Sequence, residues 1–150
     1  MHLPNYHQQS LVNLAAAVRQ AAGGDLRGYA PLALPERVVA ARHLILFIVD
    51  GLGEATVLAG GGLIARHSHS SLTSVFPTTT VSAITSLYTG VAPRQHGMTG
   101  WFTWLRELSS VATVLPFVPR HGGPSYTEMG ITPRDLMQCP SVFAGLKRPG

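Results

Sequence analysis

The sequence HLILFIVDGLG at residues 43–53 carries the strongest indication of a fold class. Its short run of Leu, Ile, Phe and Val is typical of a parallel strand that is covered on both faces, so we expect a strand over residues 43–49. Asp50 then lies at the carboxyl end of the strand, the edge of an open α/β sheet where ligands gather. A carboxylate there needs a cationic partner, and a divalent metal ion is the natural candidate.

A second stretch, SLTSVFPTTTVSAITSLYTGVAPRQHG at residues 71–97, predicts a strand, a turn and a helix. The alternating, β-branched residues 71–76 favour the strand, and Pro77 ends it. The apolar residues that follow recur at helical spacing as far as about Tyr88. Thr80 stands at the start of this helix, where unpaired amide groups and the positive end of the helix dipole attract a phosphate.

Each of these features alone has an ordinary structural interpretation, since threonines often cap helices and Asp-Gly often forms a turn. Their conjunction is more specific. The combined string resembles the type I phosphodiesterase and nucleotide pyrophosphatase family of the alkaline phosphatase superfamily, in which a VDG-type strand end is followed by FPxxT, TG, P and HG. The spacings from Thr80 to Thr89-Gly90, to Pro93 and to His96-Gly97 match that pattern without a gap.

The resemblance implies an α/β fold, the three-layer sandwich of the alkaline phosphatase type with a mostly parallel sheet. It also implies a metal-dependent hydrolase of phosphodiester or pyrophosphate bonds that acts through a phosphothreonine intermediate. In that family pattern Thr80 is the nucleophile and its backbone amide helps to hold the phosphate. Asp50 and the Thr80 oxygen bind one of two divalent metal ions, usually zinc, and the substrate is a phosphate ester or nucleotide-like small molecule.

The chain departs from better-known relatives at two places. It has Val81-Ser82-Ala83 where they often carry Phe-Pro-Asn, and Gly100-Trp101 where they carry a phosphate-contacting Asn. Trp101 either lines a substrate pocket with aromatic surface or belongs to a core or lid cluster. His96 and Gly97 are adjacent to the site in the resemblance, and we expect His96 to shape its loop by hydrogen bonding rather than to bind metal.

Residues that would complete two metal sites are missing from this sequence. Relatives supply them as Asp and His from the C-terminal half, whereas this chain has three Asp: Asp25, Asp50 and Asp135. Asp135 is better explained by a helix start that Thr132 caps. We therefore interpret residues 1–150 as a single, truncated N-terminal part of a longer domain, and we expect the final residues 140–150 to form a helix.

Two other functions stay open. A phosphomonoesterase of the same superfamily remains open, whereas the modified Cys or Ser motif of sulfatases is not present. The alternative from another class is a catalytically inactive fragment or a partner-binding module.

Composition narrows the class of protein further. With 45% hydrophobic and 12% charged residues, the chain is long enough for one core and poor in solvating charge. The net charge of +4 is scattered, so no nucleic-acid partner is indicated. No stretch is long enough to span a membrane, no signal peptide is seen, and a cytoplasmic location is the default. The lone Cys139 is a packing residue, and His67 and His69 are more easily explained as solvated than as ligands.

Further helices and a strand are predicted around the two stretches. Ser10 caps a helix that runs to Ala22. Residues 54–65 form a short helix that is interrupted at glycines 60–62, and residues 111–118 form a strand that Pro116 interrupts.

Overall fold

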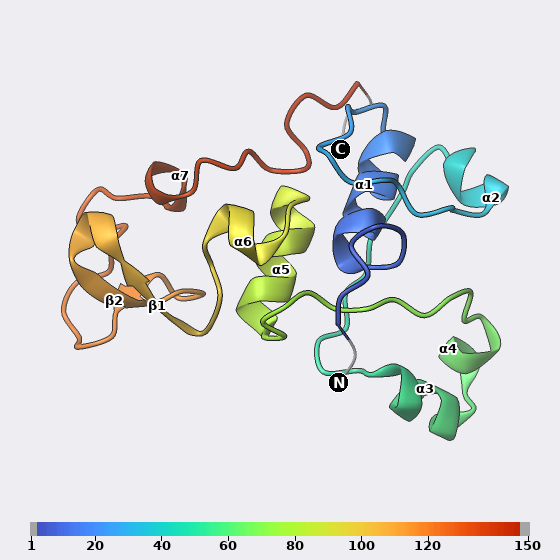
Figure 1. Cartoon of the computed structure of the whole chain (residues 1–150), viewed down its shortest axis with the longest axis horizontal. Coiled ribbons are helices and arrows are strands. Elements are labelled where there is room, and N and C mark those ends of the chain that lie inside the picture. The colour runs from blue at the N-terminus through green and yellow to red at the C-terminus, as the bar shows by residue number, and fades with distance from the viewer. Residues whose placement is uncertain (1–2, 148–150) are drawn as a thin grey trace.

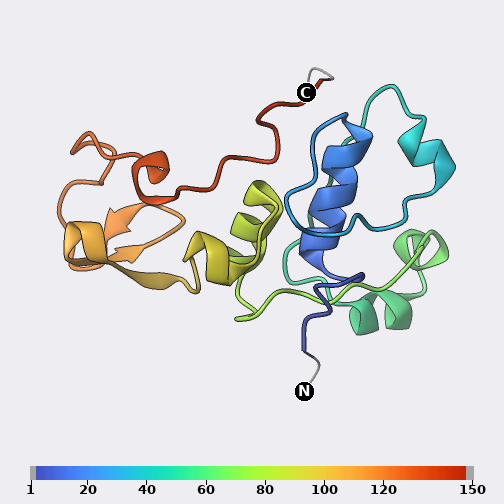
Figure 2. The ribbon, with the colours of Figure 1, turned by 45° about the horizontal axis from the view of Figure 1, so that its top comes forward.

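The computed structural model describes residues 3–147. Two packed helices occupy its middle, a small sheet lies at one end, and short helices lie at the other (Figure 1; Figure 2). In chain order the elements are α1 (Leu11–Ala21), α2 (Glu36–Val39), α3 (Glu54–Gly60), α4 (Leu63–Arg66), α5 (Thr80–Thr89), α6 (Pro93–His96), β1 (Phe102–Leu105), the 3₁₀ helix η1 (Arg106–Leu108), β2 (Ser110–Thr113), β3 (Val118–Pro119) and α7 (Pro133–Leu136).

Helix α1 begins where the sequence predicts it. The backbone amide and the hydroxyl of Ser10 both donate to the Asn13 side-chain oxygen, at 3.0 and 2.6 Å. Asn13 in turn donates to the carbonyls of Tyr6 and Ala30, so a fully buried amide has all its bonds met. The helix ends at Ala21, and the predicted N-terminal helix is confirmed.

Helix α5 is confirmed as well. Thr79 is its N-cap, and the Thr79 hydroxyl accepts a hydrogen bond from the amide of Ser82 at 3.2 Å. Val81 is buried against the sheet side of the helix, while Leu87 packs against Ala15 of α1. Because both of its faces are covered, α5 holds its N-terminal residues in a fixed position.

The sheet of the described residues differs from the predicted one. Its order is β1-β2-β3 and both pairings are antiparallel, with Phe102 opposite Thr113 and Ala112 opposite Pro119. The structure is therefore a mixture of helices and a small antiparallel sheet, and the expected mostly parallel sheet does not occur within residues 3–147. The predicted strand at residues 111–118 is split, because a turn separates β2 from β3.

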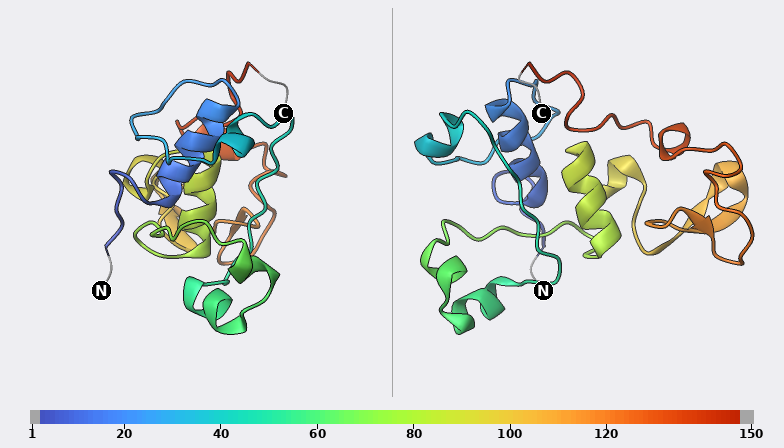
Figure 3. Two further views of the ribbon diagram at one scale, coloured as in Figure 1. Left: turned by 90° about the vertical axis from the view of Figure 1, so that its right-hand side faces the viewer. Right: turned by 180° about the vertical axis from the view of Figure 1, so that it is seen from behind.

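The predicted strand at residues 43–49 is wrong for this structure. Its backbone is extended but makes no hydrogen bond to any other described residue, and Figure 3 shows it as a blue-green trace that passes α1 without a neighbouring strand. Ile45 and Phe47 are 86% and 83% exposed. A strand needs a paired neighbour, and none of the described segments supplies one here. Residues 71–76 likewise form only one bridge, between Ser10 and Thr73.

The C-terminal segment returns from the sheet over α5 to α1 (Figure 1). α7 confirms the predicted helix start, with the backbone amide and hydroxyl of Thr132 both donating to Asp135. The helix expected at residues 140–150 is not formed at residues 140–147, which make turns instead; residues 148–150 lie outside the described part. These turns are held by Arg19, whose guanidinium donates to the carbonyls of Val142 and Ala144 at 2.5 and 2.7 Å.

The short helix predicted over residues 54–65, with its interruption at the glycines, is confirmed as α3 and α4, which Gly61 and Gly62 separate. Within the described residues, none of the helices has the length and apolar character needed to cross a membrane.

Candidate functional site

Asp50 and Thr80 come together in the structure. The Thr80 hydroxyl donates to the Asp50 carboxylate, with the oxygens 3.2 Å apart for the nearer contact and 3.5 Å for the other. Asp50 sits in a turn at the end of the extended segment, where Gly51 adopts a φ of 73° that a residue with a side chain rarely takes. The turn therefore presents the carboxylate to the start of α5.

The start of α5 supplies an anion-binding arrangement next to this pair. The Thr79 hydroxyl accepts a hydrogen bond from the amide of Ser82. Among the described residues, the amides of Thr80 and Val81 have no hydrogen-bond acceptor. Unpaired amides at the end of a ten-residue helix, together with its dipole, favour a bound anion. Thr80 thus combines a hydroxyl held by a carboxylate with a backbone amide that is free to contact a phosphate oxygen.

An open cleft of about 520 Å³ surrounds Asp50 and Thr80. Ser74, Thr78 and Thr79 line the cleft, as do apolar residues of α1 and α5. Glu54, the first residue of α3, also lines the cleft and accepts a hydrogen bond from the Ser71 hydroxyl. Glu54 was not among the residues predicted for the site, although its position four residues after Asp50, beyond two glycines, is a signal that could have indicated it.

His96 lies away from the cleft, buried against α5. The amide of Met98 donates to its Nδ1 at 3.0 Å, so the proton is on Nε2, which donates to the Ser86 hydroxyl at 3.0 Å. Burial lowers the pKa of His96 to about 4, and the neighbouring Ser82 carbonyl opposes this shift in part. The imidazole is neutral at physiological pH, and both of its nitrogens are engaged in holding the α5–α6 connection.

The two remaining sequence candidates are also outside the cleft. Gly97 caps α6 with a φ of 77°, a left-handed conformation that suits glycine. Trp101 precedes β1 and is about half exposed; its carbonyl accepts from the amide of Val114. The structure therefore brings together Asp50 and Thr80 but places neither Gly97 nor Trp101 beside them.

This geometry lies within a segment that matches a known family. Residues 44–115 match the family of type I phosphodiesterase / nucleotide pyrophosphatase. The match covers just under half of the chain and includes Asp50, Thr80 and the segment up to β2. The resemblance to this family is thus confirmed over residues 44–115, and it suggests a phosphoester hydrolase. Comparison with curated proteins and with solved structures finds no match.

The resemblance implies two metal ions, and the side chains beside Asp50 and Thr80 show whether the described residues can hold them. Asp50 and Thr80 offer two oxygen donors on converging groups, whereas a catalytic zinc site normally uses three protein ligands, with His or Cys among them. Within residues 3–147, no group of three or more His, Cys, Asp or Glu side chains is arranged to hold a metal ion. The described residues therefore do not fit a complete metal centre.

Proposed function

We propose that this chain carries the nucleophile-bearing part of a phosphoester hydrolase that cleaves phosphodiester or pyrophosphate bonds. The hydrogen bond from the Thr80 hydroxyl to Asp50, at the N-terminus of α5, is the observation that carries the proposal. A hydroxyl is a weak nucleophile, and an adjacent carboxylate that accepts its proton makes it a stronger one. The family match over residues 44–115 supports the same chemistry.

The reaction proceeds in two displacements. The Thr80 oxygen forms a bond to phosphorus, its proton passes to Asp50, and the bond from phosphorus to the leaving oxygen breaks as that oxygen gains a proton. Water then attacks phosphorus, the Thr80 oxygen leaves and regains a proton, and the phosphate product is released. The free amides of Thr80 and Val81 stabilise the negative charge of the phosphoryl oxygens throughout.

Full activity, in this proposal, also depends on divalent metal ions. Asp50 and Thr80 are the residues of this chain that would contribute oxygens to such a site, and the other ligands would come from residues of a longer domain. The exposed segment 43–49 would take its place in the parallel sheet of that domain, because its apolar side chains and unpaired backbone suit a covered central strand.

The substrate is a phosphate ester or nucleotide-like molecule. The volume of the cleft exceeds that of a phosphate group, and its apolar lining residues suit a flat or aliphatic group on the ester. Trp101 would contact the substrate only if the segment before β1 moves, since it lies outside the cleft in this structure.

Hydrolysis of bis(p-nitrophenyl) phosphate by the purified chain, with and without added zinc, tests the proposal. Thr80→Ser keeps a hydroxyl and should retain part of the wild-type rate, whereas Thr80→Ala should abolish it. Mass spectrometry of a quenched reaction should find the phosphoryl ester on the peptide that contains Thr80. Equal, measurable rates for wild type and Thr80→Ala would overturn the nucleophile assignment.

A monoesterase is the second candidate, because the open cleft does not exclude a small monoester. p-Nitrophenyl phosphate, assayed beside the diester, separates the two. Faster hydrolysis of the monoester, still dependent on Thr80, would favour the monoesterase.

A further inference from the structure

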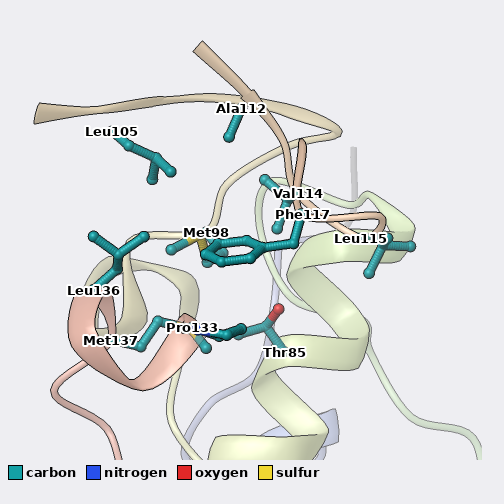
Figure 4. A pocket seen from close by; sticks show the side chains of 10 residues that line it. All are labelled: Thr85, Met98, Leu105, Ala112, Val114, Leu115, Phe117, Pro133, Leu136 and Met137. Carbon is teal, nitrogen blue, oxygen red and sulfur yellow. The ribbon is translucent and has the colours of Figure 1, made fainter. Parts of the chain in front are cut away.

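A second pocket lies on the other side of α5, between this helix, the small sheet and α7 (Figure 4). Its volume is about 140 Å³. This is close to the volume of a dry protein cavity of about 150 Å³ that admits benzene. Met98, Leu105, Val114, Phe117 and Leu136 contribute to its walls, and of its ten lining residues, all in the described part of the chain, Thr85 alone has a polar side chain.

No hydrogen bond joins the Thr85 hydroxyl to another of residues 3–147, and its oxygen is open to the pocket, because every fully buried side-chain nitrogen or oxygen of these residues has a partner. A threonine in a helix commonly donates to the carbonyl four residues earlier, and Thr89 does so to the Thr85 carbonyl at 2.7 Å. Figure 4 shows the Thr85 oxygen directed from α5 toward the opposite wall. Because this oxygen faces the pocket without a protein partner, a ligand atom in the pocket can take the place of water as its hydrogen-bond partner.

The pocket is separate from the catalytic cleft. The cleft uses Thr80, Ala83, Ile84 and Leu87 of α5, whereas the pocket uses Thr85, which projects from a different face of the helix. A ligand in the pocket would therefore not compete for space with a phosphoester beside Asp50.

We propose that this pocket binds a small ring compound of the phenol type, with the ring against the apolar walls and its hydroxyl bonded to Thr85. The volume of the pocket admits a ligand of about one six-membered ring. Because Thr85 provides the one hydroxyl among the lining residues, the ligand should carry one hydrogen-bonding group; a second polar group would be buried without a partner. Phenol meets both conditions, whereas toluene meets only the first.

Methyl NMR of the intact chain tests this inference with phenol and toluene as probes. Met98 and Met137 line the pocket and Met129 does not, so phenol should shift the first two methyl signals and leave the third unchanged. Thr85→Val preserves the shape of the side chain and should weaken phenol binding by about tenfold, equivalent to about 1.4 kcal/mol, while toluene binding stays the same. Thr127→Val, an exposed threonine outside the pocket, is the matched control.

Two results would overturn the inference. One is the absence of saturable shifts at Met98 and Met137 with millimolar phenol. The other is equal loss of phenol and toluene affinity in Thr85→Val, because that would show a change in packing rather than the loss of a hydrogen bond. Thr85→Ser, which keeps the hydroxyl and opens slightly more space, should retain the preference for phenol and guards against a Val variant that fails to fold.

Discussion

The Thr80 hydroxyl donates a hydrogen bond to Asp50 although 30 residues separate the two in sequence. The contact forms because a turn at Gly51 ends the extended segment opposite the first residue of α5. It joins the proposed nucleophile to the proposed proton acceptor at a helix N-terminus, where an anion is also favoured.

Asp50→Asn should reduce diester hydrolysis by at least about a hundredfold. The amide keeps the size of the carboxylate but cannot accept the Thr80 proton. Initial rates for Asp50→Asn and for Glu54→Gln check this, because Glu54 lines the same cleft without contacting Thr80. If only Glu54→Gln lowered the rate, Asp50 would not be the proton acceptor and the prediction would be wrong.

Zinc should bind this chain weakly and below one ion per molecule. Two oxygen donors do not complete a tetrahedral site, and the described residues contain no larger cluster of ligating side chains. Elemental analysis after dialysis against metal-free buffer measures the zinc content, with Asp50→Ala as the comparison. Tight binding of one zinc ion that survives dialysis and depends on Asp50 would contradict this expectation.

His96 should make the chain less stable in mild acid. An unfolded histidine takes up a proton below about pH 6.5, whereas burial keeps the pKa of His96 at about 4 in the folded chain. The unfolded state binds more protons between these values, so the contribution of His96 is complete above pH 6.5 and is lost as the pH falls toward 4. The loss amounts to about 3 kcal/mol.

Urea titrations at pH 7 and pH 4.5 measure this effect. His96→Gln should flatten the difference between the two pH values, and the exposed His121→Gln should leave it unchanged. Comparing each variant with the wild type cancels the contribution of Glu128 and Asp135, whose pKa values are lowered by hydrogen bonds from Ser125 and Thr132. An unchanged profile in His96→Gln would contradict the assignment.

Arg19→Met should destabilise the chain by about 2–4 kcal/mol. The buried guanidinium donates to three carbonyls, those of Asp25, Val142 and Ala144, and so ties the C-terminal segment to α1. Arg19→Lys keeps the charge but cannot reproduce the fork of donors, so it should recover only part of the loss. Thermal unfolding measures both, with the exposed Arg37→Met as the control that should stay within about 0.5 kcal/mol of wild type.

Ile45→Lys combined with Phe47→Lys should reduce self-association without lowering thermal stability. Both side chains are exposed on an extended segment whose backbone groups are unpaired, which is the arrangement that promotes edge-to-edge pairing. Sedimentation velocity over a range of concentrations measures the change. Leu26→Lys, at another exposed apolar position, is the control, and a similar improvement there would point to net charge rather than to this segment.

The sequence predicted the helices better than the sheet. The cap at Ser10, the threonine-rich start of α5 and the Thr132–Pro133 start of α7 are local signals, since each depends on residues within one turn. The strand at residues 43–49 depends instead on neighbours elsewhere in the chain. Its apolar residues were recognised correctly, but no described segment pairs with it. The sequence does not predict the antiparallel pairing of β1 with β2, because its pattern indicates a strand at residues 111–118 but none at residues 102–105.

The candidate site divides in the same way. Its residue types, spacing and family resemblance are properties of the sequence, and local patterns were enough to predict that Asp50 ends an apolar segment and that Thr80 begins a helix. The three-dimensional arrangement was needed to learn that the two oxygens lie 3.2 Å apart, that Glu54 shares their cleft, and that His96 and Trp101 lie outside it. The reason is physical: capping and periodicity act over a few residues, whereas these distances depend on how α5 packs between α1 and the sheet.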